Sequence, residues 1–476
     1  MMMKRSLILL LMACTTVALQ AKVKLPHLIA DGMVIQQDTE VRLWGWDSPG
    51  KTVRVSPSWT KTVSTARTGS DGTWMVKVRS PKASYKPLSI VFNDGEPLTV
   101  KGILAGEVWL CGGQSNMEMP MQGWGTCPTE GYNEEMLNAS KFSGVHYCMM
   151  PEIWAEQPRT DSDCKWQTVS PNTVGNVSAT AYFYARALNA SLNIPVGIIV
   201  ACKGGSRIEG WLNKENIKTY TKDPLDLESV KKKYKGNWSY PNYWYNGTLY
   251  PTMKYTVKGF IFYQGCSNVG NPAGYYSKLM NVMVDQWRTE FGLGNLPFYF
   301  VEIAPHSYGN VNNDNAARLR EEQFKASKEI SNCGEISTVD LVYPWEVQNI
   351  HPAQKRQVGE RLALKALKNQ YGFSNLRADG AEYGSMRISN DTCFVSLKNM
   401  YMGFYPTGEQ TGFEVAGADK VFHQAKAVSS GTDKLIITCP EVKAPVAVRY
   451  CFRNFKLGSV HNSAGLPLFP FRTDNW

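Results

Sequence analysis

The sequence predicts an α/β domain with a doubly wound parallel sheet, flanked on each side by a β-sandwich module. Three compositional zones predict this arrangement. Short β-rich runs with turn signals fill residues 22–104, apolar strands alternate with longer helical patterns over residues 105–371, and β runs return over residues 372–476. Strands that alternate with helices are typical of parallel βα units. The chain has 476 residues, which is enough for three domains of about 100–200 residues each.

We expect the first 21 residues to be a signal peptide. Lys4 and Arg5 precede an apolar stretch, and small residues follow up to Ala21, which is the layout of a secretory signal. The protein is therefore expected to be exported, either periplasmic or extracellular, and no second apolar stretch is long enough for a membrane span. The segment that ends at Cys14 also resembles a lipoprotein cleavage site, so a lipid anchor at Cys14 is an alternative.

Composition and charge indicate a globular protein and argue against some classes of binding partner. Hydrophobic residues make up 43% of the chain and charged residues 19%, which is typical of a globular protein. The formal net charge is +10, but no basic run exceeds the three lysines at 231–233, so we expect no nucleic-acid partner. The cysteines form no CxxC pair and no Cys/His cluster at metal spacing. We therefore expect no metal and no cofactor, and the disulfide pattern stays open.

Short β runs define the two outer zones. In the first zone, the run at 41–46 and turn signals at 31–32, 71–72 and 93–95 predict a small β-sandwich. In the last zone, runs at 393–397, 435–439 and 446–452 predict a second β domain.

The middle zone alternates between predicted strands and helices. The strands are expected at 108–111, 196–202, 260–263, 298–303 and 336–341. The helices are expected at 179–192, 275–291, 316–330 and 352–370, the last with Pro352 in its first turn, where proline is tolerated. In a doubly wound sheet, ligands and chemistry gather at the carboxyl ends of the strands.

Ser115 is the first candidate for chemistry at that edge. It follows the first strand of the middle zone and two glycines, a position that presents its hydroxyl at the sheet edge and its amide to an anion. A helix N-cap is the alternative role. A serine nucleophile needs a base, and of six histidines His351 follows the last predicted strand and so faces the same edge. His306, after the preceding strand, is a weaker alternative base, and His146 is expected in an irregular stretch.

Four sequence blocks lie along this edge. They are 106–119, which contains Gly-Gln-Ser-Asn-Met, then 201–211, 263–268 and 349–355. Together they resemble the sialate O-acetylesterase family, whose members are carbohydrate esterases with the SGNH-hydrolase fold. The resemblance also reaches 31–34 and 471–474. It therefore covers nearly the whole chain beyond the expected signal peptide, and it implies an SGNH-like parallel sheet in the catalytic domain.

The resemblance also implies roles for individual residues. Ser115 is the implied nucleophile and His351 the base that removes its proton. The implied oxyanion hole consists of the backbone amides of Ser115 and Gly205 and the side-chain amide of Asn268. Gln264 is an additional candidate contact with the substrate. The implied reaction is the hydrolysis of O-acetyl groups on sialic acid through an acetyl-enzyme.

At two positions the chain departs from the family pattern. Asn349 stands where the family usually has aspartate two residues before the histidine, and Cys266 stands where it usually has glutamate. The third member of the triad therefore stays open. Asn349 or a backbone carbonyl is ranked slightly first, and a carboxylate from Asp340 or Glu346 is the alternative. Cys266 matches a position that is not the nucleophile. On this basis, Asn349→Asp is expected to leave activity unchanged or to raise it.

The substrate is less defined than the reaction. Arg207 is a candidate partner for the carboxylate of an acidic sugar, with a solvated surface arginine as the other interpretation. Tryptophans, including Trp124, Trp211, Trp238 and Trp244, are candidates for sugar stacking or for the core. Relatives in the family also deacetylate xylan and other glycans, so an esterase for those substrates is one alternative. A glycan-binding protein with a decayed esterase site is the other.

Overall fold

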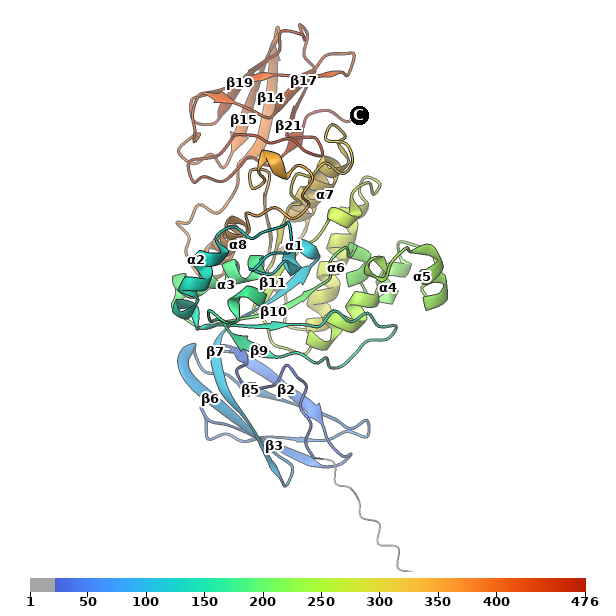
Figure 1. Ribbon diagram of the computed structural model, residues 1–476, viewed down its shortest axis with the longest axis vertical. Coiled ribbons are helices and arrows are strands. Elements are labelled where there is room, and N and C mark those ends of the chain that lie inside the picture. Colours follow the sequence, from blue (N-terminus) through green and yellow to red (C-terminus); the bar gives the residue numbers. More distant parts are fainter. Residues whose placement is uncertain (1–21) are drawn as a thin grey trace, which may run out of the picture.

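The computed structural model describes residues 22–476, so the expected signal peptide and Cys14 lie outside the described residues. Figure 1 shows three parts that follow one another along the long axis of the molecule. A β-rich N-terminal part and a β-rich C-terminal part lie at opposite ends, and the central part combines strands and helices. The predicted α/β class is confirmed for the central part.

The central sheet has the strand order β13-β12-β11-β7-β10-β8-β9. The strands from β13 to β8 are parallel to their neighbours, and β9 pairs antiparallel with β8. The bounds are β7 Pro97–Gly113, β8 Val145–Met149, β9 Trp166–Thr168, β10 Val196–Cys202, β11 Gly259–Tyr263, β12 Phe298–Val301 and β13 Cys333–Ile336. The carboxyl ends of six strands therefore meet at one edge.

Helices cover both faces of this sheet. The helices are α3 Ala179–Leu192, α6 Tyr275–Phe291, α7 Asn315–Glu329 and α8 Arg356–Gln370. Successive strand residues point to opposite faces, so Trp109 and Ile198 pack in the same cluster as α3 and α8, whereas Leu110 and Phe260 pack with α6 and α7. The predicted helices at 179–192 and 275–291 are confirmed to the residue.

Other predicted elements differ from the structure. The strand predicted at 336–341 is wrong, because β13 ends at Ile336 and the chain then turns, with the amide of Leu341 bonded to the carbonyl of Thr338. The last helix begins at Arg356 and not at Pro352, since the amide of Ala353 is bonded to the Glu346 carboxylate instead of continuing a helix. His146, expected in an irregular stretch, lies on β8.

Strand β7 joins the N-terminal part to the central sheet. Its first half pairs antiparallel with β6, and residues 107–113 pair parallel with β10. At the junction, a Cβ on Gly106 would lie 2.1 Å from the carbonyl oxygen of Pro195, so the two strands can approach only with glycine there. The remaining N-terminal strands are β1 Val34–Gln36, β2 Glu40–Trp46, β3 Thr52–Pro57, β4 Ser64–Arg67, β5 Thr73–Arg79 and β6 Ser84–Asn93.

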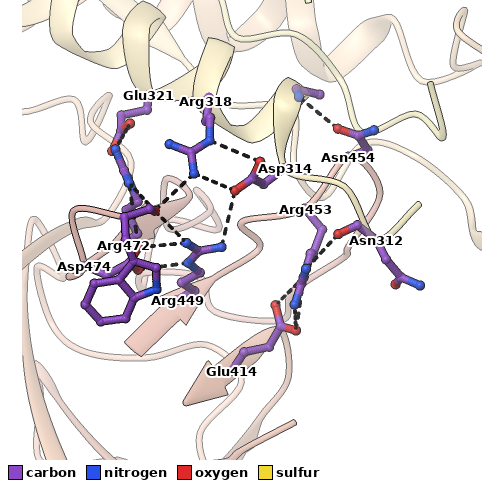
Figure 2. Close-up of polar contacts among 12 residues, drawn as sticks. Asn312, Asp314, Arg318, Glu321, Glu414, Arg449, Arg453, Asn454, Arg472 and Asp474 are labelled. Carbon is purple, nitrogen blue, oxygen red and sulfur yellow. Dashed lines mark hydrogen bonds and ion pairs between the residues drawn. The ribbon is translucent and has the colours of Figure 1, made fainter. Parts of the chain in front are cut away.

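The C-terminal part consists of two antiparallel sheets. One contains β14 Glu382–Ser389, β15 Thr392–Lys398, β20 Lys434–Thr438, β19 Lys426–Ser430 and β16 Glu409–Gln410, and the other contains β18 Phe422–Gln424, β17 Phe413–Ala416, β21 Ala447–Tyr450 and β22 Phe471–Arg472. Ion pairs dock this part on α7. Figure 2 shows Arg449 reaching Asp314 at the start of α7 and Arg472 reaching Glu321 within it.

Two further features concern the described residues as a whole. No helix within residues 22–476 combines the length and apolarity that crossing a bilayer requires. All ten cysteines of this range carry free thiols, and no group of three or more metal-ligating side chains gathers in it.

Candidate active site

Ser115 lies where β7 ends at the carboxyl edge of the sheet. Gly113 has φ +140°, and a Cβ there would lie 2.2 Å from the carbonyl oxygen of Tyr263, so the chain can leave the strand only through glycine. The amide of Gln114 then donates to that carbonyl at 3.0 Å. Ser115 is the first residue of the one-turn helix α1 Ser115–Glu118 and is half-buried. The position predicted from the sequence is the one it occupies.

The loop after β10 packs against Ser115. The amide of Lys203 donates to the carbonyl of Gly113 at 3.0 Å, and a Cβ on Gly204 would lie 3.6 Å from the Cβ of Ser115. Gly205 has φ +75°, and Trp238 lies so close that a Cβ on Gly205 would be 2.8 Å from its Cδ1. The second block therefore lies beside the candidate nucleophile, as the sequence predicts.

Asn268 lies in a short turn, Cys266–Asn268, that follows β11. Its side chain is fully buried. The Oδ1 atom accepts from the amide of Ile208 at 3.0 Å and from Nε2 of Gln264 at 2.9 Å, and Nδ2 donates to Oε2 of Glu209 at 2.9 Å. One of the two amide hydrogens thus remains for another acceptor, such as an oxyanion.

Gln264 is buried in the same network. Its Nε2 contacts Oε1 of Gln114 at 3.2 Å and the carbonyl of Ser206 at 3.1 Å, and its Oε1 accepts from the hydroxyl of Tyr276 at 2.8 Å. With 1% of its surface exposed, Gln264 holds the first three blocks together. Its contact with substrate stays a prediction.

His351 lies in the loop between β13 and α8 and is half-buried. Its Nε2 is enclosed by protein and has no hydrogen-bond partner within residues 22–476. The ring of Trp124 meets the imidazole edge-on at 5.2 Å between centroids. Burial, then the charge of Lys355 and the ring of His306, lower the pKa of His351 to about 4. The imidazole is therefore neutral at neutral pH, as a general base must be.

A buried clamp ties the helix of Ser115 to the loop of His351. Asn116 donates through Nδ2 to the carbonyl of Ile350 at 2.9 Å, and its Oδ1 accepts from Nζ of Lys355 at 2.6 Å. Lys355 is 1% exposed, and burial lowers its pKa to about 7. Asn116, which follows Ser115, thus contacts Ile350, which precedes His351. The candidate nucleophile and the candidate base therefore share one edge of the sheet.

None of the three residues proposed for the third triad position is hydrogen-bonded to the imidazole ring. Asn349 bonds only the backbone of His351, accepting from its amide and donating to its carbonyl at 2.9 Å each. Asp340 pairs instead with Arg361 at 2.6 Å and with His461 at 3.0 Å. Burial opposes ionisation of Asp340, but these two partners hold its pKa well below its usual range.

The second carboxylate candidate is also engaged elsewhere. Glu346 accepts from the amides of Tyr343 and Ala353 at 2.9 Å each. It therefore shapes the loop that carries His351 without reaching its ring.

The group that lies against Nδ1 of His351 is the thiol of Cys127. Its Sγ is 3.9 Å from Nδ1 and donates to Oδ1 of Asn349 at 3.2 Å. Sequence reasoning missed Cys127, because it lies in a loop between α1 and α2 Tyr132–Asn138 and no motif marks it. Cys266, by contrast, is buried, and that burial raises the pKa of its thiol, as expected for a residue that is not the nucleophile.

The C-terminal part also reaches the loop of His351. Asn454 is buried and donates through Nδ2 to the carbonyl of Ser307 at 3.2 Å. Ser307 in turn donates through its amide to the carbonyl of Val347 at 3.0 Å and through its hydroxyl to Oε1 of Gln348 at 2.8 Å. A chain of hydrogen bonds therefore runs from the C-terminal part to a point three residues from the base.

The candidate substrate contacts divide into two groups. Trp211 and Trp244 are at most 1% exposed and belong to the core, whereas Trp238 is 48% exposed and Trp124 is half-buried at the imidazole. Arg207 is half-buried. Of the two interpretations, the core is therefore the correct one for Trp211 and Trp244.

Arg207 already has protein partners. It donates to Oε1 and Oε2 of Glu209 at 3.0 and 3.3 Å and to Oδ1 of Asn271 at 3.0 Å. Glu209 also binds Asn268. The guanidinium thus belongs to a pair that supports the candidate oxyanion hole, and its contact with a sugar carboxylate stays a prediction.

Comparison with known proteins finds a matching family model and similar carbohydrate esterases. The family model described as "Carbohydrate esterase, sialic acid-specific acetylesterase" matches residues 105–368. The structure is similar to that of a carbohydrate acetylesterase from Xanthomonas citri, with a TM-score of 0.84, 31% identity and coverage of 96% of this chain and 100% of that one. The chain is also 26% identical over 389 residues to the sialate O-acetylesterase of Homo sapiens, which covers 74% of this chain and 72% of the human one.

Proposed function

Because this chain belongs to the sialic acid-specific acetylesterase family of carbohydrate esterases, we propose that it removes O-acetyl groups from glycans through an acetyl-enzyme on Ser115. The observation that carries the proposal is the clamp from Asn116 to Ile350 and Lys355. It joins the helix that begins at Ser115 to the loop that presents His351. A carboxylic ester hydrolase needs such a nucleophile and base at one edge.

The proposed reaction begins with proton transfer. Neutral His351 takes the hydroxyl proton of Ser115 while Oγ attacks the acetyl carbonyl. The amides of Ser115 and Gly205 and the free hydrogen of the Asn268 side chain bind the developing oxyanion, and losing one such donor typically costs about 10²–10³ in rate. Collapse of this intermediate releases the sugar hydroxyl, which receives its proton from the imidazolium.

The second half of the reaction uses water. His351 removes a proton from a water molecule, whose oxygen attacks the acetyl-enzyme carbonyl in the same oxyanion hole. Collapse of the second intermediate expels Oγ of Ser115, which takes the proton back, and acetate leaves. Throughout, Cys127 lies against Nδ1 of the base, and Asn349 holds the backbone of His351.

The first proposed substrate is an O-acetylated sialic acid, which the family supports. An acetylated neutral glycan such as acetyl-xylan is the second, because the guanidinium of Arg207 is paired with Glu209 and Asn271. We further propose that the protein is exported, on the basis of the signal-like sequence over residues 1–21.

Hydrolysis of p-nitrophenyl acetate tests the mechanism. The wild-type protein is expected to turn over this ester, and Ser115→Ala is expected to lose at least about 10³-fold of the rate, as removing a triad nucleophile does. Ser374→Ala, at an exposed serine just after α8, is the control and is expected to match the wild type. Activity that survives Ser115→Ala would exclude Ser115 as the nucleophile, and an inactive wild type would favour the glycan-binding alternative.

Acetate release from O-acetylated sialosides and from acetyl-xylan, measured side by side, ranks the two substrates. A higher kcat/KM on sialosides would support the first, and a higher value on acetyl-xylan the second.

A further inference from the structure

A small aromatic cavity lies next to the second block. It measures about 230 Å³ and is lined by Tyr220, Tyr234, Tyr275 and the pair formed by Arg207 and Glu209. Its walls come from the start of α6 and from the segment that contains α4 Lys214–Lys218 and α5 Leu227–Lys233. In Figure 1 this segment lies beside α6 at the side of the central part.

One residue that lines the cavity, Glu209, also bonds a residue of the candidate oxyanion hole. Glu209 accepts from Nδ2 of Asn268 at 2.9 Å and from Nη2 of Arg207 at 3.0 Å. Arg207 is two residues beyond Gly205, so the backbone that supplies the proposed oxyanion donor continues into the cavity lining. Trp238, half exposed, packs on Gly205. A ligand in the cavity would therefore lie close to the reacting ester.

The charges of the lining are paired with one another. Arg207 binds Glu209, and Lys233 binds Asp223. Burial raises the pKa of Tyr275 to about 12, so its phenol stays neutral and keeps its proton as a hydrogen-bond donor. An anionic ligand would have to displace a carboxylate from its cation, whereas a neutral polyhydroxyl ligand finds donors and acceptors already in place.

We infer that this cavity is the subsite for an uncharged glycosyl residue of the acetylated substrate, a conclusion that rests on the proposed esterase function. The tyrosine rings offer faces for the apolar side of a sugar ring, and the ion pairs at the rim offer partners for its hydroxyls. Pockets for drug-sized ligands measure about 300–1,000 Å³, so the smaller volume here fits one sugar ring. The cavity therefore favours the second proposed substrate, an acetylated neutral glycan, over the sialoside that the family alone would rank first.

A second cavity competes for this role. It measures about 530 Å³ and is lined by residues such as Arg42, Asn213 and Tyr250. It lies where Arg42 of the N-terminal part bonds the carbonyl at the end of α6, and its lining contains no residue of the four blocks. Tyr250 is therefore a matched control for the tyrosines of the smaller cavity.

The test compares a substrate that contains a sugar with one that does not. Tyr234→Ala and Tyr220→Ala are expected to lower kcat/KM on acetylated xylo-oligosaccharides about tenfold, mainly through KM, which corresponds to about 1.4 kcal/mol of lost binding. Both variants are expected to hydrolyse p-nitrophenyl acetate within about twofold of the wild type, because neither side chain bonds Glu209 or Asn268. Tyr250→Ala is expected to match the wild type on both substrates.

The kinetics of the tyrosine variants decide whether the small cavity is the sugar subsite. Unchanged kinetics on the oligosaccharide in Tyr234→Ala and Tyr220→Ala would overturn the subsite, and so would a selective loss in Tyr250→Ala, which would assign the glycan to the larger cavity. A wild-type preference for O-acetylated sialosides would overturn its neutral character. Failure of the esterase proposal itself is distinguishable, since the wild type would then not hydrolyse p-nitrophenyl acetate. That assay also reports whether each variant folds.

Discussion

Replacing Lys355 by methionine is expected to stabilise the protein near pH 6 and to impair its activity. Lys355 is buried, and its ammonium bonds Oδ1 of Asn116 without a carboxylate partner among the described residues. Burial lowers its pKa from the usual 10.5 to about 7, which corresponds to a cost of about 5 kcal/mol for the folded state when the group is charged in both states. Removing the hydrogen bond to Asn116 costs about 1.5–3 kcal/mol. The net gain in the free energy of unfolding is thus about 2–3.5 kcal/mol.

The pH dependence of this gain is the more specific signature. The unfolded chain keeps the Lys355 proton up to about pH 10.5, whereas the folded protein loses it near pH 7. Between these values the unfolded state binds more protons, so the stability contributed by this group rises with pH. The burial of Lys355 therefore destabilises the folded state by about 5 kcal/mol below pH 7 and by about 2 kcal/mol at pH 9. The advantage of the methionine variant should therefore nearly vanish there.

Urea unfolding at pH 6 and pH 9 measures the effect, with Lys365→Met as the control. Lys365 lies in α8 and is also buried, but it pairs with Asp379 at 2.7 Å, so its removal should destabilise the protein at both pH values. Hydrolysis of p-nitrophenyl acetate by Lys355→Met is expected to fall, because Asn116 is no longer held. A stability difference between Lys355→Met and the wild type that is the same at pH 6 and pH 9 would refute the reasoning.

Three further predictions concern the base and its supports. The rate constant kcat/KM should fall on the acidic side near pH 4, because His351 must be neutral to act. Cys127→Asp should shift this fall up by about 1–3 pH units, because a carboxylate beside Nδ1 stabilises the imidazolium. Cys127→Ser is the control and should leave it unchanged. Asn349→Asp should lower kcat, because a carboxylate cannot donate to the carbonyl of His351; an equal or higher kcat would support the expectation from sequence instead. Asn454→Ala should lower kcat with little change in KM. Asn462 is also buried in the C-terminal part, and Asn462→Ala should reduce only thermal stability. Equal losses of kcat in both variants would mean that Asn454 acts through stability alone.

Long periodic segments and strand-end motifs were predictable from the sequence. The helices at 179–192 and 275–291 carry apolar residues at helical spacing over many turns, and the structure matches them. Ser115 and His351 were placed at one edge because parallel strands align their carboxyl ends. Both inferences depend on local patterns and on a topology rule.

Contacts between distant residues were not predictable. The strand expected at 336–341 ends at Ile336, and in the turn beyond it Asp340 pairs with Arg361 and His461. No local pattern signals such a pair. Cys127 reaches His351 across 224 residues of sequence. The propensity of a short apolar run is a weak signal when tertiary contacts compete with it.

The hydrogen bonds of the C-terminal part argue against its being a separable glycan-binding module. Arg449 and Arg472 dock it on α7 through Asp314 and Glu321 (Figure 2). A second connection, from His461 to Asp340, holds the chain just after β13, and that segment leads directly into the loop of the base. Removing this part would expose the charges of α7 and free one end of the loop that presents the imidazole. Since a general base must lie within hydrogen-bond reach of its proton, the same contacts that attach the β sheets also limit where the base can lie.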